Sequence, residues 1–298
     1  MSTDFTSPTD RPSAVPPPAP SGPAQRPEPS SGGSGRTVAI VVGVVGGAVI
    51  LGTALAAGLS ALLGAGASDD VHTADVRGVA ALDVDVSASE FAIVFGDVDE
   101  AVLEVTGSRS GWSLSRDGRD LSVDRRGGLL GDWWFVGDWL GGDGREESVV
   151  LTLPESLREA GLDGDLTLSG GSLSAEGAFG ELDIEVGAGY LSFEGSATDL
   201  DVDVSAGRAE LAVDDVSRAG LSVAAGRLDA ELTGDAPSEV AVEVSAGQLD
   251  LTLPEAAYAV DSEVTAGSFD NRLDVSASSR HGVSVDVSAG QATVRAAG

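Results

Sequence analysis

A three-residue phrase, Ser-Ala-Gly or a close variant, recurs through the C-terminal part of the chain at a nearly constant interval. Its glycine stands at seven positions: Gly171, Gly189, Gly207, Gly226, Gly247, Gly267 and Gly290. The intervals between these glycines are 18, 18, 19, 21, 20 and 23 residues. Periods near 20 residues are typical of repeat proteins in which each repeat stacks on its neighbours.

Apolar and polar residues alternate on both sides of each of these glycines. The residue three before it is Val or, once, Leu, and the residues two and four after it are apolar, apart from Asn271. The residue four before it is always polar. An alternation with a period of two predicts strands with one buried face. Each repeat is therefore expected to be two short strands joined at the phrase.

Stacked repeats of this kind predict an all-β fold, a β-helix-like β-solenoid. Its apolar columns would form one core, and each backbone would pair with the repeats on either side. The Ala-Gly step disfavours a two-residue hairpin, because favoured hairpin turns place Asn, Asp or Gly first. Alanine followed by glycine suits a type II-like corner. An antiparallel sandwich is the alternative.

The region before the regular repeats reads as a degenerate version of them. Leu82–Ser89 repeats the phrase with Ser in place of Gly, and further strands are expected at Ala101–Val105, Leu121–Arg125 and Val149–Leu153. The run LTLPE occurs twice, and in both places proline stops an alternating strand. Residues 78–298 are therefore expected to form one domain.

Two segments of different composition precede this domain. Residues 1–36 carry nine of the chain's 12 prolines and are predicted to be a disordered tail. Residues 37–67 contain no charged residue. Because about 20 apolar residues suffice to cross a bilayer, this stretch is predicted to be a transmembrane helix. Residues 68–77 would then be a juxtamembrane linker.

The flanks of the apolar stretch bear on its orientation and processing. Arg26 and Arg36 precede it, so the positive-inside rule predicts a single-pass membrane protein with a cytoplasmic N-terminus and an extracytoplasmic C-terminal domain. Ala65-Gly-Ala67 resembles a signal-peptidase site, but the long polar leader favours an uncleaved anchor. Gly43 and Gly47 form a GxxxG pair, a spacing with which two spans can form a weak homodimer.

The charge of the chain excludes some classes of partner and chemistry. The formal net charge is −31, and residues 68–298 carry the whole excess, with 14 Arg against 45 Asp and Glu. Such a surface repels phosphate backbones, so no nucleic-acid partner is expected. There is no Cys, which removes thiol nucleophiles and thiolate metal sites. No cofactor is expected.

The repeats also carry a family resemblance. Alternating strands end in LTLPE and are followed by the ladder GGSLSAEG, GAGYLSFEG, SAGRAEL, AAGRLDA, SAGQLDL and TAGSFDN. With these features, residues 78–298 resemble the putative adhesin domain of bacteria, a β-rich, repeat-bearing module often carried behind a membrane anchor. Many members have Ser-Gly-Asp where this chain mostly has Ser-Ala-Gly. The resemblance implies no catalytic residues.

An aromatic cluster is the first candidate binding site. Trp133, Trp134, Phe135 and Trp139 lie in a Gly-rich stretch between two expected strands. Clustered aromatic side chains on a loop suit contact with sugars, proteins or a membrane interface. The alternative is a flap that caps the open end of the core.

Two charged columns are the other candidates. Glu185, Asp203, Glu243, Glu263 and Asp286 occupy the polar position four before the glycine. Carboxylates about 4.8 Å apart repel one another, and Ca²⁺ would relieve the repulsion, although a solvated acidic face is the favoured explanation. Arg208 and Arg227 directly follow two of the glycines and either bind an anion or neutralise neighbouring acids.

Together these observations predict a membrane-anchored, non-catalytic, adhesin-like protein of the cell surface. Its ligand, protein or glycan, is not identified by the sequence. One alternative is an envelope-stress or signalling component with an extracytoplasmic sensing domain. A carbohydrate-active enzyme is less favoured, because no loop gathers paired acids with a base.

Overall fold

The computed structural model describes residues 70–107, 111–125 and 147–298. Within these ranges the chain forms 20 β-strands and one short 3₁₀ turn, η3 (Glu155–Leu157), without an α-helix. The all-β prediction is confirmed. No helix in these ranges is long and apolar enough to span a membrane. The predicted tail (1–36) and span (37–67) lie outside the described residues.

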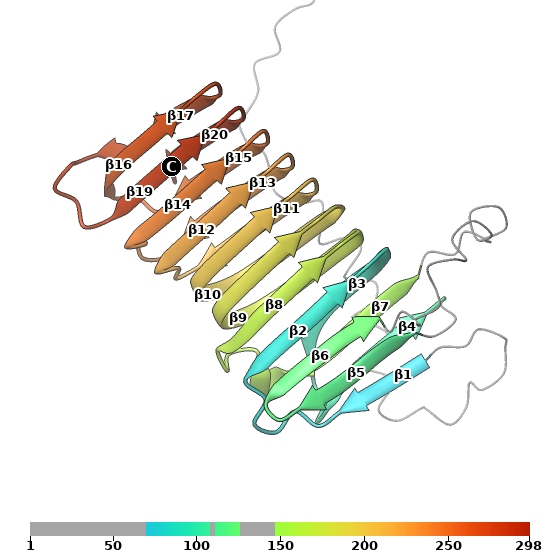
Figure 1. Cartoon of the computed structure of the whole chain (residues 1–298). Helices are drawn as coiled ribbons and strands as arrows, with labels where there is room; N and C mark the ends of the chain where they lie inside the picture. The colour runs from blue at the N-terminus through green and yellow to red at the C-terminus, as the bar shows by residue number, and fades with distance from the viewer. Residues whose placement is uncertain (1–69, 108–110, 126–146) are drawn as a thin grey trace, which may run out of the picture. The chain divides into compact units, whose positions relative to one another are not determined.

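Each corner is flanked by one strand before it and one after it, and we name such a pair of strands a rung. The strands before the corners lie side by side in one ladder and the strands after them in a second ladder (Figure 1). In spatial order, the first ladder is β5 (Trp112–Asp117), β6 (Asp120–Arg125), β2 (Ala81–Val86), β8 (Leu162–Leu168), the second half of β9 (Gly171–Val186), the second half of β10 (Tyr190–Val204), β12 (Arg218–Val223), β14 (Glu239–Val244), β19 (Gly282–Val287) and β16 (Ala257–Val264).

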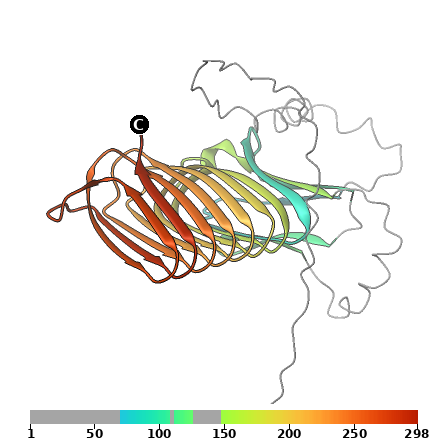
Figure 2. The ribbon, with the colours of Figure 1, turned by 90° about the horizontal axis from the view of Figure 1, so that it is seen from above.

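The second ladder has the same order of rungs. It is β1 (Asp70–Ala74), β4 (Ala101–Thr106), β7 (Ser148–Pro154), β3 (Ser89–Gly96), the first halves of β9 and β10, β11 (Arg208–Asp214), β13 (Arg227–Thr233), β15 (Gln248–Leu253), β20 (Gln291–Ala296) and β17 (Ser268–Arg272). The short β18 (Asp274–Val275) pairs with β16. Figure 2 shows the chain winding from rung to rung.

Neighbouring rungs are parallel and in register. Val204, before a corner, lies opposite Val186 and Val223 of the two adjacent rungs. Arg208, after the same corner, lies opposite residues of those same two rungs. The strands that flank this corner therefore pair with other rungs and not with each other. The hairpins that an antiparallel sandwich would place at the Ala-Gly steps are not formed.

Alternate residues of every rung point inward and form one buried cluster that runs through the stack. Apart from Val264, the residue three before each corner glycine is at most 1% exposed. Burial of one Val or Leu side chain stabilises a fold by about 1.5–3 kcal/mol. Repetition of these columns, one set for each rung, therefore supplies the main stabilising contribution.

At the C-terminal end the rungs do not stack in the order of the sequence. Gln248 is opposite Gln291, 43 residues later, and Ser268 lies on the far side of Gln291. The last rung of the chain, β19/β20, is thus inserted between β14/β15 and β16/β17. The inserted rung is apolar at every core position, whereas β16/β17 carries Ser262 and Asn271 at two of them, both exposed. A polar residue, Asn271, is therefore tolerated in this otherwise apolar column, because its rung forms the end of the stack.

The N-terminal end uses the same arrangement and adds a cover. The rung β2/β3 lies between β6/β7 and β8/β9, and its Ser89 is opposite Gly171, as the degenerate phrase predicted. Strands β4 and β5 then pair antiparallel with β7 and β6, and β1 pairs antiparallel with β4. The stretch 68–77, expected to be a linker, therefore contributes a strand to the second ladder.

Close approach between rungs explains the glycine at the later corners. A Cβ on Gly247 would lie 2.6 Å from the carbonyl oxygen of Gly226 and 2.4 Å from Cγ1 of Val223. A Cβ on Gly290 would lie 2.4 Å from both the carbonyl oxygen of Gly247 and Cγ1 of Val244. Real Cβ atoms do not approach other atoms so closely, so any side chain here would separate the rungs.

The backbone angles correct one expectation about these corners. Among the corner glycines only Gly171 and Gly189 adopt positive φ, at +89° and +97°. The type II-like corner, which requires positive φ at its glycine, is therefore wrong for the remaining five, which are Gly207, Gly226, Gly247, Gly267 and Gly290.

We expect the substitution Gly290→Ala to lower the free energy of unfolding by about 1–3 kcal/mol, as overpacking does. The matched control is Gly282→Ala, whose Cβ would have its nearest contact at 3.8 Å, with Ser238. That change should alter stability by less than about 1 kcal/mol. Equilibrium denaturant unfolding measures both, and equal effects would contradict the close-approach explanation.

The inserted rung gives a second prediction. Val294 is fully buried in β20, and its register partner Asn271 is exposed in β17. Val294→Asn should lower the free energy of unfolding by about 2–5 kcal/mol, because it removes a buried apolar side chain and buries an amide in its place. Asn271→Val removes only an exposed hydrogen bond from the Leu273 N–H and should change stability by less than about 1 kcal/mol. If Asn271→Val were as damaging, the order of rungs would be wrong.

Candidate functional site

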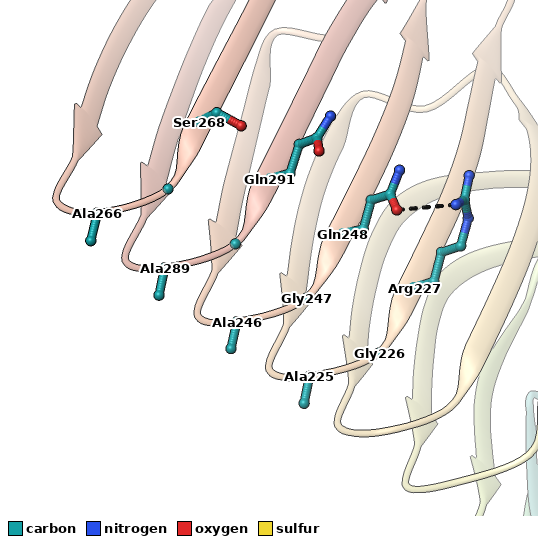
Figure 3. A pocket seen from close by; sticks show the side chains of 12 residues that line it. Ala225, Gly226, Arg227, Ala246, Gly247, Gln248, Ala266, Ser268, Ala289 and Gln291 are labelled. Carbon is teal, nitrogen blue, oxygen red and sulfur yellow. Dashed lines mark hydrogen bonds between the residues drawn. The ribbon is translucent and has the colours of Figure 1, made fainter. Parts of the chain in front are cut away.

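A shallow groove of about 640 Å³ runs along the corners of the four rungs nearest the C-terminal end of the stack. Each rung contributes the alanine and glycine of its corner and the residue that follows. In spatial order these are residues 225–227, 246–248, 289–291 and 266–268, and we call their surface the corner groove. Figure 3 shows the alanine side chains on one side of the corner line and Arg227, Gln248, Gln291 and Ser268 on the other.

The backbone of each of these corners leaves one peptide group outside the ladder. In the corner of β14/β15, the N–H groups of Ser245, Ala246 and Gln248 donate to the preceding rung at 2.9, 2.7 and 3.0 Å. Neither the N–H of Gly247 nor the carbonyl of Ala246 has a partner within the described part of the chain. The other three corners repeat this pattern, so in each corner the N–H and the C=O of the Ala-Gly peptide are unpaired within the described residues.

The side chains of the groove are polar and partly paired. Arg227 donates to both carboxylate oxygens of Asp229 at 2.8 and 3.0 Å, to Asp250 at 3.0 Å and to the Gln248 amide oxygen at 3.1 Å. The hydrogen bond to Asp229 raises the pKa of Arg227, against the opposite effect of burial. Two carboxylates therefore neutralise this guanidinium, as the second interpretation of Arg227 predicted.

Two side chains of the groove are less engaged. Among the described residues, Gln291 and Ser268 form no side-chain hydrogen bond, and both are exposed. Thr293, two residues beyond Gln291 on the same outward face, is only 8% exposed and also forms no side-chain hydrogen bond there. The Gln291 carboxamide and the Ser268 hydroxyl are therefore available to an external partner.

The other predicted cation, Arg208, lies outside the groove. Its guanidinium approaches Glu210 at 3.9 Å, and both side chains are about half exposed. The Tyr190 hydroxyl, opposite Arg208 in register, donates to Glu210 at 2.9 Å. Arg208 is therefore only weakly paired, and a surface contact of this length contributes little to stability.

The predicted acidic column is interrupted in space. Glu243, Asp286 and Glu263 lie on three adjacent strands, whereas Ser222 separates Glu243 from Asp203. Within the described residues, no three or more His, Asp or Glu side chains are arranged so that they could hold a metal ion.

A more continuous acidic row lies two residues earlier on the same ladder, and the sequence analysis missed it. Asp83, Asp165, Asp183 and Asp201 are directly opposite one another on four neighbouring strands. Burial raises the pKa of Asp83, Asp183 and Asp201, and neighbouring carboxylates of the row raise it further. The row could have been found by comparing the position six before each glycine.

The same ladder holds an acidic residue, Asp199, whose pKa is lowered instead of raised. Arg218 Nε donates to Asp199 Oδ1 at 2.6 Å, and this hydrogen bond lowers the pKa of Asp199. These two residues border a second hollow of about 270 Å³ beside Asp201 and Gly220. The absent side chain at Gly220 leaves the space that the Asp201 carboxylate occupies, since a Cβ there would lie 2.6 Å from Asp201 Oδ2.

The predicted aromatic site, Trp133, Trp134, Phe135 and Trp139, lies outside the described residues. Its segment, 126–146, stands between β6 and β7, where the other rungs have a corner of two or three residues. The fourth tryptophan, Trp112, is a core residue. It packs on Phe91 with ring centroids 5.4 Å apart and donates from Nε1 to Glu147.

The acidic row predicts that the folded domain gains stability as the pH falls. A carboxyl whose pKa is raised by folding stabilises the fold in full below its ordinary value of about 3.9, and the contribution is lost as pH rises through the raised value. Asp201→Asn should therefore raise the midpoint of thermal unfolding at pH 7 and have a smaller effect at pH 4.

Asp199→Asn is the matched control for this prediction. The pKa of Asp199 is lowered, so its contribution is present above the ordinary pKa and is lost as the pH falls through the lowered value. Asp199→Asn should therefore lower the midpoint at pH 7. If both substitutions shifted the midpoint in the same direction at pH 7, repulsion along the row would not be a determinant of stability.

Neither a family model nor a curated protein matches the chain. Among solved structures it is similar to a putative adhesin from Parabacteroides distasonis, with TM-score 0.42 and 11% identity over 77% of this chain and 97% of that one. It is also similar to a putative adhesin from Parabacteroides merdae, with TM-score 0.38 and 14% identity over 78% and 96% of the two chains. A putative cell adhesion protein from Clostridium sporogenes gives TM-score 0.35 and 10% identity over 78% and 100%. The two Parabacteroides structures carry the adhesin name of the family that the repeats resemble.

Proposed function

We propose that this protein is a non-catalytic, adhesin-like binding protein of the cell surface. Residues 37–67 would anchor it in the membrane, residues 1–36 would lie in the cytoplasm, and the folded C-terminal part would be a β-solenoid outside the cell membrane. The observation that carries the proposal is the corner groove, because it presents free polar groups in the same arrangement on four neighbouring rungs.

The chemistry of the groove supports binding rather than catalysis. Its polar groups are peptide units, carboxamides, a hydroxyl and a guanidinium that is neutralised by Asp229 and Asp250. Amides are poor nucleophiles, and their pKa values lie too far from neutral pH for general acid or base catalysis. They are good hydrogen-bonding partners, and groups held in place before binding lose little entropy when a ligand arrives.

The parallel stack supports the solenoid and its rigidity. Each strand of an interior rung pairs on both sides along nearly its whole length, as β11 does with β10 and β13. A ligand that spans several rungs would meet groups whose mutual distances are set by the backbone ladder. Such pre-organisation is what a stationary surface receptor requires.

The charge of the chain supports a position away from nucleic acid and anionic lipid. The 45 acids of residues 68–298 outnumber the 14 arginines, and the row from Asp83 to Asp201 concentrates several of them on one ladder. A field of this sign repels phosphate groups. It is compatible with a domain that projects from the membrane rather than lying on it.

The proposal is tested with the full-length protein, expressed with a C-terminal epitope in its bacterial host. The epitope should be accessible to antibody, and the domain removable by protease, on intact cells. The purified full-length protein in detergent should bind isolated cell-envelope material in a saturable manner. An epitope accessible only after lysis, or the absence of saturable binding, would overturn the proposal.

The aromatic segment gives a further prediction within this proposal. Combined replacement of Trp133, Trp134 and Trp139 by Ala should weaken envelope binding if this cluster contributes to the surface that contacts ligand. In that case these side chains are not needed by the core, and the thermal unfolding midpoint should be unchanged. A drop in the midpoint with binding intact would instead identify the cluster as a cap of the core. Deletion of 1–36 serves as the control, since it should leave binding unchanged unless the tail acts in signalling.

A further inference from the structure

We propose that the corner groove binds a neutral, extended polysaccharide chain that lies along the stack. This inference rests on the proposed surface-binding function and names the surface and the chemical class of the ligand. It depends on three properties of the groove, which are its repeat, its hydrogen-bonding groups and its charge.

The repeat of the groove favours an extended polymer. The four corners belong to adjacent, parallel rungs, and neighbouring strands lie about 4.8 Å apart, so the groove extends for about 14 Å. One rung is comparable in length to one sugar ring in an extended chain. A small compact ligand would meet only one or two of the equivalent corners and would leave the others unused.

The hydrogen-bonding groups favour hydroxyl groups. Every corner leaves the N–H and the C=O of its Ala-Gly peptide unpaired within the described residues. Because these two groups of a trans peptide point in opposite directions, each corner can offer one of them to a ligand in the groove. Gln291 adds a carboxamide that both donates and accepts, and Ser268 adds a hydroxyl group with the same dual capacity. A ligand that satisfies donors and acceptors along the groove must itself carry both, as the hydroxyl groups of a sugar do.

The charge of the groove disfavours an anionic ligand. An anion would meet Asp229, Asp250 and Asp270, which stand in the next outward column, and the single guanidinium of the groove is already paired with two of them. A neutral ligand avoids this repulsion.

The small side chains of the corners keep the groove open. The four alanines are exposed, while a Cβ on any of the four glycines would collide with the adjacent rung. The glycines are thus required by the stack, whereas the alanines can be enlarged without disturbing it. Enlarging exposed alanines therefore blocks the groove while the core stays intact.

The experiment measures binding of the full-length protein in detergent to neutral hexasaccharides of glucose, mannose and galactose, with the hexasaccharide of galacturonic acid as the anionic probe. We expect at least one neutral hexasaccharide to bind and the galacturonic acid probe not to bind. The double variant Ala246→Leu, Ala289→Leu should weaken binding about tenfold or more, and Gln291→Ala should weaken it in the same direction.

The matched control is Ala188→Leu, an exposed corner alanine of the rung β9/β10, which lies outside the groove. It should leave binding unchanged, and all variants should retain the thermal unfolding midpoint. Absence of binding to every neutral probe, equal binding of the galacturonic acid probe, or binding that survives the double variant would each overturn the inference. If envelope binding persists while neutral sugars fail, the ligand class is wrong and the proposed function stands. Loss of both would overturn both.

Discussion

Each later corner glycine lies against the carbonyl oxygen of the glycine and the γ-methyl group of the valine on the neighbouring rung, and the stack depends on this contact. A Cβ at Gly226 would come within 2.4 Å of the Gly207 oxygen and 2.6 Å of Val204 Cγ1. The same contact brings the N–H of Arg227 to the Gly207 oxygen at 3.0 Å. Backbone pairing and side-chain packing thus require the same small residue at the same place.

This requirement shapes the surface as well as the core. Because the corner holds only Ala and Gly, no large side chain covers its free peptide group, and a groove forms where corners are adjacent. The proposed binding surface is in this sense a by-product of close packing. Its polar rim differs from rung to rung, from Arg227 to Gln248, Gln291 and Ser268, which is where specificity for a ligand would be set.

Electrostatics opposes the stack on one ladder, and packing outweighs it. In-register strands place Asp83, Asp165, Asp183 and Asp201 in one row, although like charges directly opposite one another destabilise a sheet. The buried positions between them, Leu82, Val84, Leu166, Ile184 and Val202, are at most 3% exposed. Burial of one such side chain stabilises the fold by more than the repulsion between two screened, partly exposed carboxylates destabilises it. The acidic side chains are therefore tolerated on the outer face.

Much of this protein could be predicted from the spacing of its residues. The period of two located the strands, the apolar columns located the core, and the recurrence of Ser-Ala-Gly located the corners, because these properties depend on neighbouring residues only. The sequence could not give the order of corners in the groove, since the corner 289–291 lies between 246–248 and 266–268 only in the assembled stack. It also could not order the rungs at the ends. That order depends on which repeat loses the least stabilising apolar burial when one side of it faces solvent, and this is decided only in the assembled stack. The rung β19/β20 is covered on both sides, while β16/β17, with Asn271 and Ser262, lies at the edge.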